Sequence, residues 1–232
     1  SSDKMFVTGD ELTFNDDAST TDVNLAEDVT PGNIFFKNNK KDYSLAGKGS
    51  ILGKGSLNVE GTGTVNIKNT NKYSGGTNIK GGILAPATLA NKEGLEFGSL
   101  GSADNTITLS NKGTLKVASG MTASHPIVLG ENGGTINNTG TLILNGGITR
   151  ANGGKNRDLY KTGTGTLQLN CDADFDVFYI NQGTVYDFQD AHFSGKTIVL
   201  NGSKVVFQAS NSIYSSNSDN VNIEVPKGKS GI

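Results

Sequence analysis

The sequence predicts an all-β fold, a single right-handed parallel β-helix (solenoid) with irregular coils, and three features lead to this prediction. Apolar and polar residues alternate in short runs such as 57–59 and 65–67, which is the period of a half-buried strand. Glycine or asparagine separates the runs, as at Gly61 and Gly63, where positive φ permits a sharp turn. The same pattern then recurs farther along the chain at a nearly constant offset.

The recurrence links residues 57–84 with residues 159–185. Gly163 takes the place of Gly61 (163 − 61 = 102) and Gly183 that of Gly82 (183 − 82 = 101). Landmarks that keep their spacing favour stacked supersecondary units over the alternative, a two-sheet antiparallel sandwich. Coils of roughly 20–25 residues would give about ten turns, stacked about 4.8 Å apart. Five leucines should then point inward: Leu115, Leu142, Leu144, Leu167 and Leu169.

Two strings also resemble a known family. Residues 161–169 (KTGTGTLQL) and 71–84 (NKYSGGTNIKGGIL) are similar to the autotransporter-associated β-strand repeat of bacterial surface passengers. The resemblance implies a β-helical scaffold that is secreted from, or displayed on, a Gram-negative bacterium. That family includes autotransporter passengers and large secreted proteins, some of which carry polysaccharide-degrading modules. The repeat is a scaffold motif, so it implies no particular activity.

Composition narrows the function classes. Hydrophobic residues make up 34% of the 232 residues, and the formal net charge is −2. The low apolar share suits a thin solenoid core, and the balanced charge excludes the basic field of a nucleic-acid-binding protein. No apolar run approaches the roughly 20 residues of a membrane span. Cys171 is the sole cysteine, so no intrachain disulfide can form; we interpret it as a small buried residue.

The whole chain, 1–232, is interpreted as one β-helix segment, and its two ends suggest a piece of a longer protein. No signal peptide precedes Ser1, and the last residues would open another strand. Residues 1–36 could form an N-terminal cap, through the acidic segment 10–28, because the first coil of a solenoid must hide an open edge. The Gly-Lys pairs within 43–55, 195–197 and 228–230 lack the spacing of a phosphate-binding loop and are interpreted as corners.

Two segments interrupt the alternation and are predicted as excursions between coils. Residues 85–100 are the only plausible helical stretch, limited to a turn or two by Pro86 and Gly94. Residues 148–158 contain two arginines and are the best candidate for a projecting loop, the usual place for function on a solenoid. Asn-rich corners such as 111–113, 132–134 and 145–147 suit left-handed backbone and stacked Asn ladders.

The least repeat-like stretch is 171–193. Asp172, Asp174 and Asp176 alternate, which places them on one face with Phe175 and Val177 on the other. The run lacks the glycine and the terminal acid of a calcium loop, so no metal ligand is predicted. Four aromatic residues could stack on sugar rings or fill a widened core, and we favour the core: Tyr179, Tyr186, Phe188 and Phe193.

No catalytic or cofactor-binding residue is predicted, and no cofactor. His125 and His192 stand alone, without metalloprotease or nucleophile-elbow context. One group has the makeup of a polysaccharide lyase, which needs a base beside carboxylates or a metal. It consists of Arg150, Arg157, Asp172, Asp174 and Asp176. The offset from Arg150 to Asp172 (172 − 150 = 22) is about one coil, so these residues could be stacked neighbours.

The sequence therefore favours a non-catalytic structural or adhesive scaffold, or stalk, of a secreted or surface-exposed bacterial protein. The alternative is a polysaccharide-lyase-like or carbohydrate-binding accessory module of a glycan-degrading protein. The expected partner is a glycan or a host or cell-surface ligand, with no nucleic acid and no membrane span, and the chain is expected to be a monomer. The extracellular, outer-membrane-associated location rests on the family resemblance alone.

Overall fold

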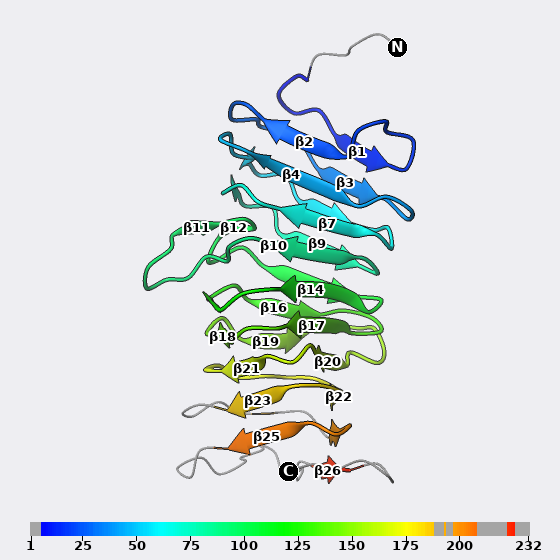
Figure 1. Cartoon of the computed structure of the whole chain (residues 1–232), viewed down its shortest axis with the longest axis vertical. Coiled ribbons are helices and arrows are strands. Elements are labelled where there is room, and N and C mark those ends of the chain that lie inside the picture. The colour runs from blue at the N-terminus through cyan, green and yellow to red at the C-terminus, as the bar shows by residue number, and fades with distance from the viewer. Residues whose placement is uncertain (1–5, 188–192, 194–196, 208–221, 226–232) are drawn as a thin grey trace.

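The computed structural model describes residues 6–187, 193, 197–207 and 222–225. Over these residues the chain is all-β, without helix, and forms a β-solenoid of about nine turns (Figure 1). The N-terminal strands lie at one end of the long axis and the last strands at the other. The predicted β-solenoid is therefore confirmed, and the number of turns is close to the expected ten. The glycines of the corners predicted at 195–197 and 228–230 lie outside the described residues.

Among the described residues, three parallel sheets run along the solenoid, and they are called the first, second and third sheet in the order in which the chain enters them. The first has seven strands: β1 (Leu12–Asn15), β3 (Ile34–Lys37), β6 (Leu57–Val59), β9 (Thr77–Lys80), β13 (Ile107–Ser110), β16 (Ile127–Leu129) and β19 (Ile148–Arg150). The second has ten: β2 (Asp22–Leu25), β4 (Tyr43–Gly47), β7 (Thr64–Ile67), β10 (Ile83–Pro86), β14 (Gly113–Val117), β17 (Gly134–Asn138), β20 (Leu159–Thr162), β22 (Val177–Ile180), β24 (Thr197–Leu200) and β26 (Asn222–Glu224). The third has five: β15 (Met121–Ala123), β18 (Leu142–Leu144), β21 (Thr166–Leu169), β23 (Thr184–Asp187) and β25 (Lys204–Phe207).

Two smaller sheets complete the described fold. Strands β5 (Leu52–Gly53) and β8 (Lys72–Tyr73) pair in parallel, whereas β11 (Phe97–Gly98) and β12 (Gly101–Ser102) are antiparallel. Partners one coil apart are separated by as few as 18 residues, between Leu167 and Val185 (185 − 167 = 18), and by as many as 31, between Ile83 and Thr114 (114 − 83 = 31). The coils are therefore irregular, as predicted.

Alternation along the strands builds the core. Strands such as β6 and β7 bury every second residue, and apolar side chains in these inward positions exclude water along the whole stack. Cys171, expected to be buried, is only half-buried and packs against the edge of this core. The five leucines predicted to point inward are each 2% exposed or less, which confirms that part of the prediction: Leu115, Leu142, Leu144, Leu167 and Leu169.

The two copies of the sequence repeat occupy different corners of the solenoid. Gly61 lies between β6 and β7, where the chain passes from the first sheet to the second; Gly163 lies between β20 and β21, where it passes from the second to the third. In each copy the amide of a buried asparagine one coil earlier, Asn38 or Asn138, donates two hydrogen bonds to backbone carbonyls. The motif therefore encodes a corner, independent of which sheets the corner joins.

An asparagine ladder forms between two of the three predicted corners, 111–113 and 132–134, whereas Asn145 does not have positive φ. Asn111 and Asn132 adopt positive φ, and the Asn132 Nδ2 donates to the Asn111 Oδ1 at 2.9 Å. The Asn78 Nδ2 likewise donates to the Asn58 Oδ1 of the preceding coil at 2.9 Å. These side chains satisfy each other between coils, as amide ladders do in stacked strands.

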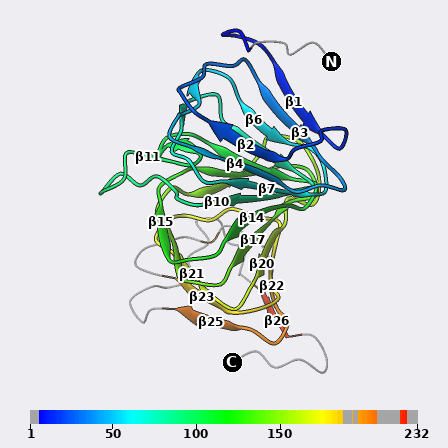
Figure 2. The same ribbon diagram turned by 45° about the horizontal axis from the view of Figure 1, so that its top comes forward.

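The helical turn expected within residues 85–100 is wrong. Strand β10 runs through Pro86, opposite Ile67, and the chain then forms the β11–β12 hairpin, which projects from the stack (Figures 1 and 2). The Thr88 amide donates to the Ser99 Oγ at 3.2 Å, and Leu89 is buried in the core. Tertiary packing overrides the weak helix propensity of this short segment. Residues 87–105 are called the excursion below.

The other two segments that the sequence sets apart also contain strands. The first three of residues 148–158 form β19, so the irregular loop starts after Arg150. The acidic segment 10–28 contains β1 and β2 of the first coil. Its Asp16 carboxylate accepts the backbone N–H groups of Asn39, Lys40 and Lys41, which fastens the second coil to the first.

Candidate functional site

Coil stacking brings the lyase-like arginines and aspartates to one corner. Ile148 of β19 bridges Ala173 of the next coil in parallel, and the Asp174 amide donates to the Ile148 carbonyl at 2.8 Å. Arg150 therefore ends one coil beside the aspartates of the following coil. Arg157 approaches the same corner from the loop that precedes β20.

The contacts form one network of ion pairs. The Arg150 Nε lies 2.8 Å from the Asp174 Oδ1, and another of its guanidinium nitrogens lies 2.7 Å from the Asp176 Oδ1. The Arg157 Nε lies 3.2 Å from the Asp176 Oδ2, an oxygen that also accepts the Arg157 backbone N–H at 2.8 Å. Asp172 joins through its carbonyl, which accepts the Ile148 amide at 2.9 Å. The predicted proximity of these residues is thus seen.

Electrostatics in this network favours the charged forms. The paired carboxylates of Asp174 and then of Asp176 raise the pKa of Arg150 above its ordinary value, against the opposing effect of burial. Burial raises the pKa of Asp176, but hydrogen bonds from Arg150 and Arg157 outweigh it and bring that pKa below the usual range. An arginine held more firmly protonated is a poorer base. The positive charges of Arg150 and Arg157 and the negative charges of Asp174 and Asp176 therefore neutralise one another.

Two backbone contacts of this network fix the polypeptide loop between Arg150 and Arg157. The Arg157 guanidinium donates to the Ala151 carbonyl at 3.0 Å, and the Asp176 amide donates to the Arg157 carbonyl at 3.0 Å. These bonds tie the segment between Arg150 and Arg157 to the next coil. The charged groups of Arg150, Arg157, Asp174 and Asp176 pair with one another, and these pairs hold the loop between the two arginines in place.

The aromatic residues of the last described coils divide between core and surface. Phe193 is buried against Phe175, with ring centroids 5.9 Å apart, as the core interpretation predicts. That interpretation is wrong for Tyr179 and Tyr186, which are half-buried on the outward phase of their strands. Phe188 and His192 lie outside the described residues.

The alternation also shifts within this stretch. Val177, expected on the same face as Phe175, is half-buried whereas Phe175 is buried, because the inward positions of β22 are Phe178 and Ile180. The two inward residues Phe175 and Phe178 are three positions apart, so the alternation changes phase at a corner, where a strict period of two does not hold. The Phe175 and Phe178 rings still meet in the core, with centroids 5.3 Å apart.

The Tyr160–Tyr179 pair is a poor platform for sugar rings. The two rings stack on each other with centroids 4.9 Å apart, and the Lys112 ammonium lies 5.9 Å from the Tyr160 centroid. The Tyr160 hydroxyl donates to the Asp158 carboxylate at 3.2 Å. Burial, and after it the Asp158 charge, raises the pKa of Tyr160 to about 12. The stacked faces are thus closed to a sugar, which would need a ring face of its own.

Sequence reasoning missed the role of His125, which holds the excursion. This buried imidazole accepts the Ala90 N–H at its Nε2 (3.1 Å) and lies 2.9 Å from the Asn105 carbonyl at its Nδ1. The neutral tautomer with a proton on Nδ1 satisfies both contacts. Burial lowers the pKa of His125 below its ordinary value, which favours that neutral form. One side chain therefore fastens both limbs of the excursion to the solenoid.

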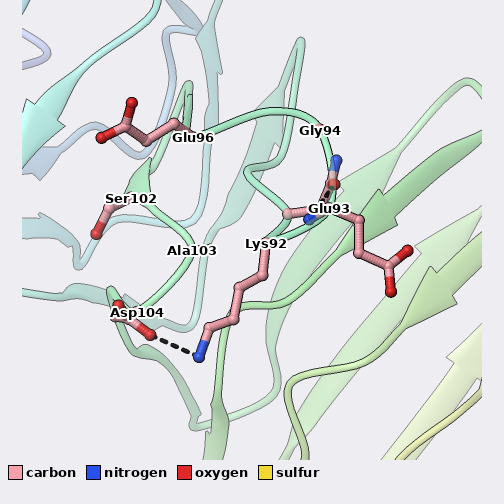
Figure 3. A pocket seen from close by; sticks show the side chains of 8 residues that line it. Lys92, Glu93, Gly94, Glu96, Ser102, Ala103 and Asp104 are labelled. Carbon is pink, nitrogen blue, oxygen red and sulfur yellow. Dashed lines mark hydrogen bonds and ion pairs between the residues drawn. The ribbon is translucent and has the colours of Figure 1, made fainter.

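Two polar depressions border the excursion. The first, about 650 Å³, lies within it (Figure 3), where the Lys92 ammonium crosses to Asp104 at 2.8 Å while Glu93 and Glu96 point apart. The second, about 500 Å³, separates the excursion from the corners of three successive coils and is called the corner groove. Its lining consists of Lys92, Glu93, Ser124, Pro126, Asn145, Gly146 and Asn170. Both depressions are wide, polar and open to solvent, and their linings contain no aromatic residue.

A buried lysine is the second feature that sequence reasoning missed. Lys161 is fully buried, and its ammonium donates to the carbonyls of Thr162 (2.8 Å), Gly163 (2.7 Å) and Gln182 (3.1 Å). Burial lowers the pKa of Lys161 to about 8. The signal was present, because Lys161 falls on the inward phase of the alternating strand that starts at Leu159. Its role is to bind two coils at a corner.

Within the described part of the chain, no group of three or more His, Cys, Asp or Glu side chains is placed to hold a metal ion. No helix there has the length and apolar character needed to cross a bilayer. Comparison of the chain with protein-family models, with curated proteins and with solved structures gave no match. The geometry described above therefore carries the functional argument by itself.

Proposed function

We propose that this protein is a non-catalytic scaffold or stalk of a secreted or surface-exposed bacterial protein. One observation carries the proposal: the ten-stranded parallel sheet runs from β2 to β26, from one end of the described solenoid to the other. Such a stack satisfies its backbone hydrogen bonds along its whole length and needs only neighbouring coils for support. It can therefore hold two other parts of a protein at a distance from each other without needing a large hydrophobic core.

The arginine–aspartate network supports the scaffold over a lyase. A lyase base must reach the sugar, and its carboxylates or metal must meet the acidic substrate. Here Arg150 and Arg157 are paired with Asp174 and Asp176, and the resulting contacts hold the loop to the next coil. The same residues thus have a structural role that explains their geometry.

The catalytic question is tested by a turnover screen. We expect no unsaturated product, followed by ultraviolet absorbance, from acidic polysaccharides with or without calcium. Turnover that Asp174→Ala abolishes, and that the exposed-surface variant Asp104→Ala leaves intact, would replace the scaffold with the lyase. The stalk is tested by small-angle scattering, which should show a rod-like particle with a radius of gyration above the roughly 17–18 Å of a globular chain of this length.

The surface location is the part of the proposal that rests on the repeat resemblance. It is tested in the native organism by protease shaving of intact cells followed by mass spectrometry. Peptides of this chain should be released from intact cells as readily as those of a known surface protein. Their recovery only after lysis would reject the location while leaving the scaffold role standing.

A carbohydrate-binding role is the second candidate, and the corner groove is the observation that favours it. Asn145 lines the groove beside Ser124 and Asn170, so polar side chains from three successive coils border it. Such a polar lining can hydrogen-bond the hydroxyl groups of a sugar. Binding on a glycan array should be lost in Asn145→Ala and kept in Asn78→Ala, which removes an amide from the first sheet instead.

A further inference from the structure

The tripeptide Asn-Gly-Gly occurs three times in the chain, and the structure gives its copies different surroundings. They are residues 132–134, 145–147 and 152–154. The first two lie at corners, at the start of β17 and between β18 and β19, whereas the third lies in the loop between β19 and β20. A fourth Asn-Gly pair, at Asn201, is followed by serine, and the Asn201 Nδ2 donates to the Asn181 Oδ1 at 2.6 Å. Because the three tripeptides are identical, a difference in their reactivity reports on the fold.

Asparagine followed by glycine is the dipeptide most prone to lose its side-chain amide in water. Hydroxide removes the proton of the glycine backbone nitrogen, that nitrogen forms a bond to the asparagine Cγ, and the bond from Cγ to the side-chain nitrogen breaks. The departing nitrogen takes up a proton from water and leaves as ammonia, so a cyclic succinimide remains. Water then opens the ring at either carbonyl carbon, which gives aspartate or isoaspartate. Glycine favours the attack because it has no Cβ to hinder the approach.

The first corner occupies both reacting groups with hydrogen bonds. The Asn132 Nδ2 donates to the Asn111 Oδ1 at 2.9 Å, so the carboxamide is held in the ladder. The Gly133 N–H, whose nitrogen would attack, donates to the Gly130 carbonyl at 3.1 Å. Ring closure therefore requires both bonds to break, which amounts to local opening of the corner.

The second corner is held by its backbone. Asn145 is half-buried, and its N–H donates to the Ala123 carbonyl at 2.8 Å. The Gly147 carbonyl accepts the Ile127 N–H at 2.9 Å. Between them, Gly146 lies so close to the preceding coil that a Cβ built on it would overlap carbonyl oxygens there. The peptide that must rotate is thus fixed on both sides, and the reaction again requires the corner to open.

The third copy lies exposed in the loop. Among the described residues, neither the Asn152 carboxamide nor the Gly153 N–H has a hydrogen-bond partner. A Cβ built on Gly153 would meet nothing within 4 Å, so the space around the reacting peptide is open. The Arg157 guanidinium donates to the carbonyls of Ala151 and Gly153, at 3.0 and 3.4 Å. These bonds hold the loop but leave the attacking nitrogen and the carboxamide free.

We propose that Asn152 is a site of spontaneous deamidation in the folded chain, with water as the co-reactant, and that the corners protect the other two copies. The product has a new carboxylate between the two carbonyls that Arg157 binds. Isoaspartate also lengthens the backbone here, because the chain then runs through the former side chain. The modification thus falls in the loop that the ion pairs of Arg150 and Arg157 hold. Deamidation at this position does not depend on the scaffold role.

The test compares the three asparagines within one chain. The folded chain is kept in mildly alkaline buffer, sampled over time and digested. Cleavage after lysine and arginine places Asn152 in residues 151–155 and the other two copies in residues 117–150, where fragmentation in the mass spectrometer localises the change. Asn152 should deamidate at least about tenfold faster than Asn132 or Asn145, because the corners must first open. Isoaspartate and aspartate should both be found at this position.

Two controls separate the fold from the local sequence. In urea that unfolds the chain, the three asparagines should deamidate at similar rates, because their tripeptides are identical. Asn152→Gln should abolish most of the ammonia released by the folded chain and leave its circular dichroism spectrum unchanged, since an exposed side chain is replaced. Equal rates for the three asparagines in the folded chain, or an excess at Asn152 that persists in urea, would overturn the proposal.

Discussion

Lys161 occupies, beneath Gly183, the position that Val59 occupies beneath Gly82. A Cβ built on Gly183 would lie 2.9 Å from the Lys161 Nζ, and one built on Gly82 would lie 2.8 Å from the Val59 Cγ1. The same corner thus accepts a charged or an apolar inward residue. In the copy with lysine, backbone carbonyls replace the water that the ammonium loses.

The pH dependence of stability should reveal this ammonium. The pKa of Lys161 is lowered from 10.5 to about 8 in the folded chain. Between these values the unfolded chain holds a proton that the folded chain has released, so the free energy of unfolding should rise with pH, by up to about 3 kcal/mol in total. Urea unfolding across this pH range measures the slope. Lys161→Met should lack this rise, and equal slopes in both proteins would contradict the assignment.

Acid should loosen the excursion through His125. The folded-state pKa of His125 is lowered from 6.5, so the unfolded form binds the proton first and stability falls as the pH drops below about 6.5. Protonation also removes the Nε2 acceptor of the Ala90 N–H. Hydrogen exchange at Ala90, corrected for intrinsic rates, should accelerate about tenfold per pH unit at most below that point. His125→Gln should remove the pH dependence, and the matched control His192→Gln should keep it.

Removing one carboxylate from the ion-pair network should destabilise the chain. Asp176→Asn leaves two partly buried guanidinium groups without their shared partner, at an expected cost of about 1–3 kcal/mol. Urea midpoints measure the difference. Asp104→Asn is the control, because both side chains of its ion pair with Lys92 are mostly exposed. Such a pair should contribute less than about 1 kcal/mol to the free energy of unfolding. Similar losses for both variants would argue against a structural network.

Two glycines provide a matched test of coil packing. A Cβ at Gly146 would overlap the carbonyl oxygens of His125 and Ser124, whereas one at Gly120 would lie 3.6 Å from the Thr141 carbonyl oxygen, an ordinary contact. Neither glycine has positive φ. Gly146→Ala should therefore lower the thermal midpoint by several degrees, at a cost of about 1–3 kcal/mol. Gly120→Ala should leave it unchanged or slightly raised; the reverse order would refute the packing argument.

Features set by local periodicity could be predicted from the sequence. The inward positions of Leu142 and Leu167 follow from alternation alone, and the 22-residue offset between Arg150 and Asp172 suffices to place them on neighbouring coils. Features that depend on variable coil length could not be predicted. His125 meets Ala90 across 35 residues, a separation that no local pattern specifies. The helix predicted for the excursion fails for the same reason, because contacts outside the segment stabilise its strands.

The corner motif has a consequence for how such a chain can be lengthened. The copies around Gly61 and Gly163 keep nearly the same internal spacing (82 − 61 = 21 and 183 − 163 = 20) and yet join different pairs of sheets. A duplicated segment that holds whole strands but not whole turns can therefore be inserted without breaking the stack. Each strand after the insertion then lies in the next sheet around the solenoid axis. Gene duplication in such a protein changes the direction in which the outer residues face as well as the length of the rod.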